Sequence, residues 1–266
     1  MTGGAGGLGR AIATALMARG AAVGLVDLAE GVQGVAAELA KDGGGKAAAA
    51  SFDITDAAAA ATGVAALANE LGPIDILVNN AGIVDNAAPV ATMEPAAWRR
   101  EIEVNLTGAF TMIQAVLGAM VERGWGRIVN ISSVAARGGL HFQAGYAASK
   151  AGLIGLTHTV TLEHARHGIT CNVVLPGLTY TEKVRSMPPE IRANTASTTP
   201  ARRLGEAHEI AHVVAFLASP GASYVCGAEI DVDGGFRLNA SSLASRKEVA
   251  DTRGLSEAAG AREKAS

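Results

Sequence analysis

Apolar strand-like runs alternate with helix-like stretches along most of the chain, and this alternation limits the possible folds more than any other feature. The runs at 76–78 and 128–129 are continuously apolar, as expected for strands buried on both faces. Strands joined by helices form a parallel sheet, so the pattern predicts a doubly wound α/β fold with helices on both faces. The predicted strands are residues 21–28, 46–53, 74–80, 126–133, 169–176 and 228–232, and the predicted helices are residues 7–19, 29–42, 56–71, 95–122, 145–167 and 206–218.

Composition narrows the class of protein further. Hydrophobic residues make up 49% of the 266 residues and charged residues 18%, which is enough to build the core of one large domain. The net charge of −3 argues against nucleic acid as the main partner. Because no apolar run reaches the ~18 residues of a membrane span, we expect a cytoplasmic protein with no membrane partner. We expect one domain over residues 1–240 and a polar, disordered tail over residues 241–266.

A glycine-rich segment, residues 2–9, precedes the first predicted helix and has the composition of a phosphate-binding turn. A helix N-terminus attracts phosphate, and Gly3, Gly7 and Gly9 lack Cβ atoms where the backbone must approach a pyrophosphate. Only Met1 stands before this turn, whereas a doubly wound sheet has its first strand at the centre. We therefore expect the first central strand to be missing from this chain and the true start to lie upstream.

Asp27 ends the predicted strand that follows the first helix, about 20 residues after the glycines. A carboxylate at this position can accept hydrogen bonds from the ribose hydroxyls of a dinucleotide. It would repel a 2′-phosphate by about 4 kcal/mol at ~4 Å and an effective dielectric of ~20, and the turn offers no Arg or Lys to offset this. NAD is therefore favoured over NADP. The alternative is that Asp27 is only a turn or cap residue.

Tyr146 and Lys150 are spaced i, i+4 in a predicted helix, so their side chains share one face. A phenol is a weak base at neutral pH, and a neighbouring ammonium lowers its pKa. The predicted strand 126–133 ends in Ser132 and Ser133, whose hydroxyls can hold a substrate oxygen at the carboxyl edge of the sheet, where this architecture binds ligands. These residues predict general acid–base chemistry on an oxygen atom.

Taken together, the motifs resemble those of the short-chain dehydrogenase/reductase family, in its branch of single-domain enzymes of about 250 residues. The resemblance runs from Thr2 to about Gly235 and implies a Rossmann-like fold. The matching residues are Thr2-Gly-x-x-x-Gly7-Leu8-Gly9, Asp53-Ile54, Asn79-Asn80-Ala81-Gly82, the tetrad Asn105, Ser133, Tyr146 and Lys150, and Pro176-Gly177 with Thr179 and Thr181.

The resemblance also implies roles for these residues. Tyr146 would exchange a proton with the substrate oxygen, and Ser133 would hydrogen-bond that oxygen. Lys150 would lower the pKa of Tyr146 and bind the nicotinamide ribose. Asn105 would interrupt a helix and position a water that leads from Lys150 to solvent. The implied cofactor-binding residues are Gly3, Gly7, Leu8, Gly9, Asp27, Asp53, Ile54, Asn80, Ala81, Gly82, Tyr146, Lys150, Pro176, Gly177, Thr179 and Thr181.

The predicted function is an NAD-dependent oxidoreductase that interconverts a secondary alcohol and a ketone, with 3-hydroxyacyl thioesters among the candidate substrates. One alternative is an NADPH-dependent reductase of 3-oxoacyl carrier-protein thioesters, which the chain resembles at 152–155 and 203–205. Another is a catalytically silent nucleotide-binding scaffold, suggested by the short start. The resemblance further implies a homo-oligomer, a tetramer or dimer, packed through the helices near 95–122 and 145–167.

One competing motif is rejected. Residues 208–212 read His-Glu-Ile-Ala-His and satisfy the H-E-x-x-H pattern of zinc proteases. Glu209 could act as a general base in such a site, but no third ligand is evident nearby in the sequence, so we expect no metal site.

Overall fold

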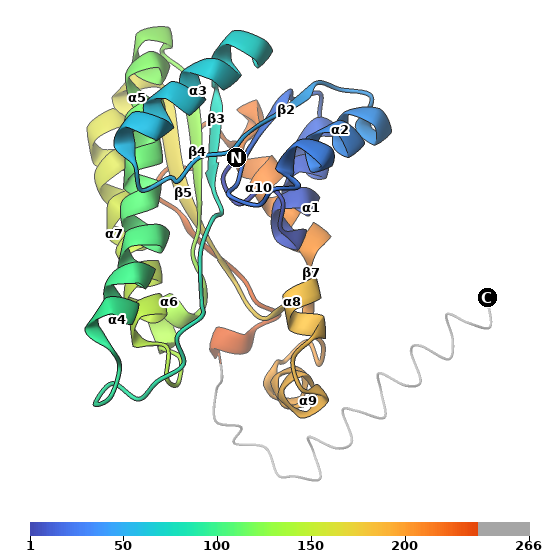
Figure 1. Cartoon of the computed structure of the whole chain (residues 1–266), viewed down its shortest axis with the longest axis vertical. Coiled ribbons are helices and arrows are strands. Elements are labelled where there is room, and N and C mark those ends of the chain that lie inside the picture. Colours follow the sequence, from blue (N-terminus) through green and yellow to red (C-terminus); the bar gives the residue numbers. More distant parts are fainter. Residues whose placement is uncertain (239–266) are drawn as a thin grey trace, which may run out of the picture.

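A computed structural model of the chain describes residues 1–238, and its centre is a parallel β-sheet (Figure 1). Four strands lie side by side in the order β3-β4-β5-β8, and β1 pairs separately with β2. All of these pairs are parallel. The strands are β1 (Val23–Val26), β2 (Ala47–Ala50), β3 (Ile76–Asn79), β4 (Gly126–Ile131), β5 (Ile169–Pro176) and β8 (Glu229–Val232), and a separate short pair consists of β6 (Thr179–Tyr180) and β7 (Gly205–Glu206).

Helices cover both faces of the sheet, which confirms the predicted doubly wound class. The three helices α1, α2 and α10 lie on one face and α3, α5 and α7 on the other (Figure 1). The helices are α1 (Gly7–Met17), α2 (Val32–Gly43), α3 (Ala57–Leu71), α4 (Pro95–Ile102), α5 (Gly108–Arg123), α6 (Ala135–Gly138), α7 (Ala144–His164), α8 (Glu182–Arg185), α9 (Pro189–Thr198) and α10 (Ala207–Leu217).

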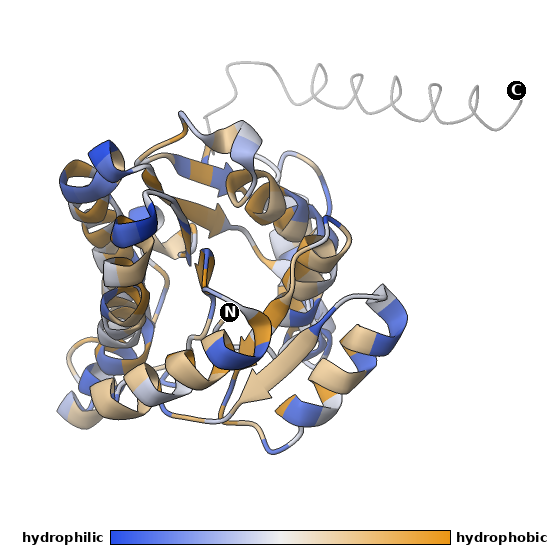
Figure 2. Ribbon diagram, turned by 90° about the horizontal axis from the view of Figure 1, so that it is seen from above, coloured by the Kyte–Doolittle hydropathy of each residue, from blue (hydrophilic) through white to orange (hydrophobic). Residues whose placement is uncertain are grey.

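The two parts of the sheet meet at the first two residues. Thr2 forms a parallel bridge with Val26 of β1, and its N–H donates to the carbonyl of Val78 in β3 at 3.0 Å. Met1 accepts from the N–H of Val26 at 2.8 Å. Met1 and Thr2 therefore occupy the central position of the sheet, where the sequence predicts a first strand. Seen from above, the N-terminus lies in the middle of the surrounding elements (Figure 2).

The predicted helix 95–122 is a continuous helical run with one irregular turn. A π-helical turn, η1 (Glu103–Thr107), separates α4 from α5. By length and hydropathy alone, the whole run, Pro95–Arg123, could cross a membrane, although the sequence analysis predicted no such span. Half of its most apolar window is buried within the domain, as in a core helix. Residues 182–198, which the sequence left unassigned, form α8 and α9. The predicted tail, 241–266, lies outside the described residues.

Candidate active site

A cavity of about 700 Å³ opens at the carboxyl ends of β1, β2 and β3. This volume is typical of a cofactor or ligand site. The edge at which the cavity lies is the one predicted for ligand binding in a parallel sheet. Eleven predicted cofactor residues line it, namely Gly3, Gly7, Leu8, Gly9, Asp27, Asp53, Ile54, Asn80, Ala81, Gly82 and Thr181.

The glycine-rich turn forms one wall of the cavity and leads into α1. Gly3 has φ +64°, a left-handed conformation that favours glycine. A Cβ atom on Gly9 would lie 2.1 Å from the carbonyl oxygen of Gly3, so no larger residue fits there without moving the turn. Gly6 caps α1, and no side chain of residues 1–238 accepts from the first N–H groups of this helix. These groups and the helix dipole suit a pyrophosphate, so the turn fits the cofactor that the sequence implies.

Thr2 and Asn80 fasten this turn to the end of β3. The Thr2 hydroxyl accepts hydrogen bonds from the N–H groups of Asn80, at 3.1 Å, and Ala81, at 3.0 Å. In return, the Asn80 amide donates to the carbonyls of Thr2, at 3.1 Å, and Gly3, at 3.0 Å. The side chain of Asn80 thus fixes the turn, while the residue as a whole lines the cavity.

Asp27 follows β1 and stabilises the turn from the opposite side. Its carboxylate accepts from the N–H of Ala5 at 2.9 Å and from the N–H of Ala29 at 3.1 Å. Asp27 therefore has the turn-holding role that was the alternative to ribose binding. The same residue lines the cavity, so the two roles are compatible, and the ribose contact remains a prediction.

Asp53 and Ile54 follow β2 at the far end of the cavity. The Asp53 carboxylate accepts from the N–H of Thr55 at 2.9 Å, and this bond is the main reason that the pKa of Asp53 lies below its usual value. Phe52 and Arg100 also line this end. Sequence reasoning missed both, because nothing in a linear pattern shows that α4 brings Arg100 across to the loop after β2.

Lys150 lies buried behind the cavity, on the same side of α7 as Tyr146. Its ammonium donates to the carbonyl of Ile131 at 2.8 Å and lies 5.7 Å from the centre of the Tyr146 ring. A Cβ atom on Gly82 would lie 3.2 Å from the Lys150 ammonium and 3.2 Å from Oδ1 of Asn105. Lys150 and Asn105 therefore both approach the chain at Gly82, where a Cβ atom would make tight contacts with each of them.

Asn105 lies in the π-helical turn η1 and is almost wholly buried. Its Oδ1 accepts from the N–H of Ile83 at 2.7 Å. Its amide nitrogen donates to the Ile83 carbonyl at 2.9 Å and to the Ser149 hydroxyl at 3.1 Å. The predicted interruption of the helix is thus present, since π turns insert an extra residue and often occur at functional sites. The water that Asn105 was expected to position remains a prediction.

The protonation of Tyr146 differs from the expectation. Burial raises the pKa of this phenol above its ordinary value, the Ser133 hydroxyl opposes this, and Glu101 adds to it. Lys150 was expected to lower this pKa, but burial outweighs any such effect in this structure. Burial also lowers the pKa of Lys150 from 10.5 to about 8. Because the pKa of Tyr146 is raised, its phenol is protonated at neutral pH.

Pro176, Gly177 and Thr179 lie beyond the cavity wall, in the loop after β5. The N–H of Gly177 donates to the carbonyl of Val232 at 3.0 Å, and the Thr179 hydroxyl donates to the carbonyl of Gly177 at 3.1 Å. Among the predicted cofactor residues in this loop, Thr181 lines the cavity, and its side chain also caps α8. The other three shape the loop that carries Thr181.

Glu101 of α4 is an acidic residue that the sequence analysis did not select. It is fully buried, and within residues 1–238 neither carboxylate oxygen has a hydrogen-bond partner. It packs against the start of α7, where a Cβ atom on Gly145 would lie 2.5 Å from Oε2. A charged residue in a helix is usually exposed, so its sequence gave no sign of this position.

Replacing Glu101 with Gln should lower the pKa of Tyr146, because the substitution removes the acidic group and keeps its shape. It should also raise the free energy of unfolding by about 1 kcal/mol, since a neutral amide replaces a carboxyl group that is buried without a partner. The rate of alcohol oxidation as a function of pH reports the first effect, and urea unfolding the second. Glu103→Gln is the matched control, an exposed residue two positions away. An unchanged pH profile would show that Glu101 does not influence Tyr146.

The rejected H-E-x-x-H motif has a structural explanation. Glu209 accepts from the N–H of Glu206 at 2.8 Å and forms an ion pair with Arg203. These contacts cap α10 and lower the pKa of Glu209 to about 2. Among residues 1–238, no group of three or more His, Cys, Asp or Glu side chains is arranged to hold a metal ion.

Comparison with known proteins identifies the family. A family profile described as enoyl-(acyl carrier protein) reductase matches residues 3–237. The chain belongs to the short-chain dehydrogenase/reductase family. It is thus an oxidoreductase that acts on CH–OH groups and uses a nicotinamide cofactor.

Individual members of the short-chain dehydrogenase/reductase family are similar over most of their length. Cis-4-hydroxycyclohexanecarboxylate dehydrogenase of Sinomonas cyclohexanicum is 42% identical over 236 residues, 89% of this chain and 94% of that protein. The 3-oxoacyl-acyl-carrier-protein reductase of Escherichia coli K12 is 42% identical over 240 residues, 90% of this chain and 96% of that protein. The crystal structure of levodione reductase superposes with a TM-score of 0.85 at 36% identity, covering 89% of this chain and 96% of that one.

Proposed function

We propose that this enzyme is NAD-dependent and interconverts a secondary alcohol and a ketone. The observation that carries the proposal is the grouping of Lys150 and Asn105 at Gly82, a cavity-lining residue, with Tyr146 one helical turn from Lys150. Nothing else in residues 1–238 combines a buried cation, a phenol and a nucleotide-sized cavity. We expect it to work in the cytoplasm.

A bound nicotinamide would supply the hydride chemistry at this site. Tyr146 gives a proton to the substrate oxygen during reduction and takes it back during oxidation. The Ser133 hydroxyl, next to the phenol, hydrogen-bonds the same oxygen and orients it. Lys150, fixed by the Ile131 carbonyl, would hold the nicotinamide ribose. Asn105 keeps the loop at Ile83 in place and links this group to Ser149.

The names of the similar proteins suggest two kinds of substrate. One is a hydroxylated ring acid, as in cis-4-hydroxycyclohexanecarboxylate dehydrogenase, and the other is a 3-oxoacyl thioester, as in the carrier-protein reductase. A 3-oxoacyl thioester fits the NADPH-dependent alternative, so the preference for NADH or NADPH separates the two candidate functions. The test is titration with NADH and NADPH by fluorescence, followed by a panel of cyclic alcohols, polyols and 3-hydroxyacyl thioesters. NADPH preference together with thioester turnover would overturn the proposal in favour of the carrier-protein reductase.

Asp27 supports NAD, because its carboxylate lines the cavity next to the glycine-rich turn. We expect Asp27→Asn to shift the ratio of kcat/KM for NADH over NADPH toward NADPH by about 10- to 100-fold, since it removes the repulsion of a 2′-phosphate. Asn retains one oxygen that can accept from Ala5, although its amide nitrogen cannot replace the acceptor for the N–H of Ala29. Asp42→Asn, at an exposed position in α2, is the control. A ratio that does not change would exclude Asp27 from the ribose site.

We also propose that the enzyme assembles into a dimer or tetramer through its long helices. Phe110 on α5 is 44% exposed and Leu162 on α7 is 86% exposed. Both are large apolar side chains on the two helices that the family resemblance assigns to subunit contacts, and a second copy would cover them.

A further inference from the structure

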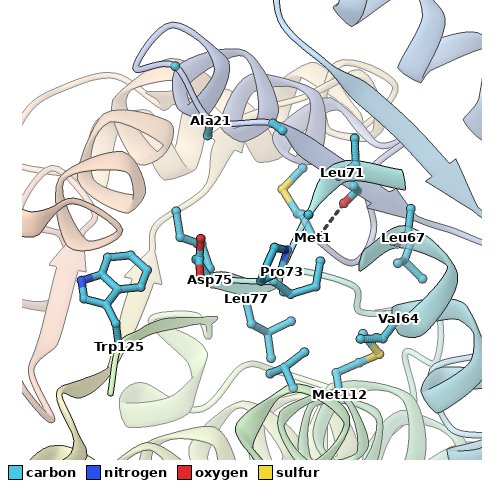
Figure 3. Close-up of a pocket in the computed structure, with 18 residues that line it drawn as sticks. Met1, Ala21, Val64, Leu67, Leu71, Pro73, Asp75, Leu77, Met112 and Trp125 are labelled. Atoms are coloured by element: carbon cyan, nitrogen blue, oxygen red, sulfur yellow. Dashed lines mark hydrogen bonds between the residues drawn. The ribbon is translucent and has the colours of Figure 1, made fainter. Parts of the chain in front are cut away.

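Polar side chains gather in the core between β4 and α7, in contrast to the space between β1 and β3. A cavity of about 320 Å³ between those two strands is lined mainly by apolar residues such as Leu67, Leu71 and Met112 (Figure 3). Asp75 has the single charged side chain in that lining. Buried polar groups cost free energy unless they are hydrogen-bonded, so the region between β4 and α7 depends on specific contacts. Five of its residues are at most 4% exposed, namely Asn130, Ser132, Ser149, Lys150 and Thr157.

Lys150 is held at both of its ends by two consecutive residues at the carboxyl end of β4. Its ammonium donates to the carbonyl of Ile131 at 2.8 Å. Its own backbone carbonyl accepts from the Ser132 hydroxyl, also at 2.8 Å. Ser132 is fixed in turn, because its N–H donates to the carbonyl of Val174 in β5 at 2.8 Å. The sheet therefore determines both where the backbone of Lys150 lies and where its side chain ends.

The Ser132 hydroxyl is not available to a substrate. The sequence placed Ser132 and Ser133 together as candidates for holding a substrate oxygen. Ser132 is 3% exposed, and the one proton of its hydroxyl is donated to the Lys150 carbonyl. Ser133 is only half-buried, and its hydroxyl hydrogen-bonds the Tyr146 phenol, whose pKa it lowers against the effect of burial. The two adjacent hydroxyls therefore have different partners and different tasks.

The hydrogen bond from Ser132 is an addition to α7 that the helix does not need for its own completion. Lys150 lies well inside α7, so its carbonyl also has the N–H four residues further on as a helical partner. Removing the Ser132 hydroxyl would therefore leave no carbonyl without a partner, and the effect on folding should be small. What the bond specifies is the position of Lys150 relative to β4.

The position of Lys150 matters because its side chain is long and its ammonium has several donors. A lysine has a flexible four-carbon stem and three N–H groups. Within residues 1–238, the Ile131 carbonyl is the one hydrogen-bond acceptor of this ammonium, so two N–H groups remain for ribose hydroxyls near Gly82. Their direction depends on where the stem begins, which Ser132 fixes, and where the first donor ends, which Ile131 fixes. A small displacement of a positioning group can lower a rate by about 100-fold.

We propose that Ser132 is a positioning residue, which places Lys150 through its backbone carbonyl and thereby strengthens its contact with the nicotinamide ribose. The proposal rests on the proposed function, in which Lys150 holds that ribose. Thr157 provides a comparison within the same helix, two turns beyond Lys150. Its hydroxyl accepts from the amide of Asn130 in β4 at 2.9 Å and donates to the carbonyl of Leu153 at 2.7 Å. Thr157 therefore also ties α7 to β4, but at a distance from the ammonium.

The first test compares three variants of the full chain. Ser132→Ala should weaken NADH binding, measured by fluorescence titration, by about 5- to 10-fold and lower the Tm by about 3 °C at most. Thr157→Val, the matched control, should lower the Tm at least as much and leave NADH affinity unchanged. Ser132→Thr keeps the hydroxyl and should bind NADH within about 2-fold of the wild type, although its added methyl group should lower the Tm. Affinity is thus expected to follow the hydroxyl at position 132 and not the stability of the fold.

The second test asks whether Ser132 acts through Lys150. In a Lys150→Met background, Ser132→Ala should cause no further loss of NADH affinity, because the side chain that it positions is absent. A full additional loss in that background would overturn the proposal. So would equal NADH affinity in Ser132→Ala and the wild type, or an equal loss in Ser132→Ala and Thr157→Val. Each titration is repeated with NADPH, so a preference for NADPH would contradict the proposed function without changing the comparison among the variants.

Discussion

Tyr146→Phe should lower kcat by about 100- to 10,000-fold in both directions, which is the contribution of a well-placed acid–base group. The substitution removes only the hydroxyl, so the ring and its packing near Lys150 remain. Affinity for NADH, measured by fluorescence titration, should therefore change far less than kcat, because the other implied cofactor residues remain. Tyr224→Phe is the control, because that phenol is fully exposed. Equal turnover in the Tyr146→Phe variant and the wild type would show that another group transfers the proton.

The raised pKa of Tyr146 adds a pH dependence to this prediction. Because the phenol stays protonated at neutral pH, it is ready to donate a proton, and ketone reduction should proceed at full rate there. Alcohol oxidation needs the phenolate, so its rate should rise with pH from 7 to beyond 10. Initial rates in both directions across this range check the prediction.

Lys150→Met should abolish most activity and yet stabilise the fold. Burial moves the pKa of Lys150 from 10.5 to about 8, which corresponds to a cost of about 3 kcal/mol for the charged form in the folded state. Methionine of similar length removes this cost but loses the hydrogen bond to Ile131, so we expect a net gain of about 1–3 kcal/mol at pH 7. Turnover should fall by about 100-fold or more, since the ribose contact is lost.

The pH dependence of stability gives this second prediction a specific signature. Below pH 8, Lys150 is charged in both folded and unfolded chains, and the folded state bears the whole cost. Between pH 8 and 10.5 the folded state loses this proton first, so the wild type gains stability and the advantage of the variant disappears. Urea unfolding at several pH values measures this difference. Lys41→Met, at an exposed position, should show no such trend. A variant that is less stable than the wild type at pH 7 would contradict the argument.

Much of the fold and part of the site could be predicted because they depend on local patterns. Apolar runs predicted the six strands β1, β2, β3, β4, β5 and β8, and one helical turn of spacing was enough to place Tyr146 and Lys150 on the same side of α7. The glycine-rich turn and Asp27 were found because a helix start and a strand end have characteristic residues. Each of these features depends on neighbours that are close in the sequence.

The rest depends on packing between distant segments. Glu101 looks like a surface residue in its own helix and is buried only because α7 covers it. The pKa of Tyr146 rises because of the protein around it, whereas the spacing to Lys150 suggested the opposite. Arg100 and Phe52 belong to the cavity only because α4 and the loop after β2 both line it. No pattern along the chain contains this information.

The π-helical turn at residues 103–107 has a consequence for the architecture around it. One additional residue rotates everything beyond it by about 100° around the helix axis. The helix α4 packs against α7, whereas α5 packs against α3 and the strands β3 and β4. The π turn thus joins two helices that pack against different neighbours, and Asn105 lies at the point where the direction of packing changes.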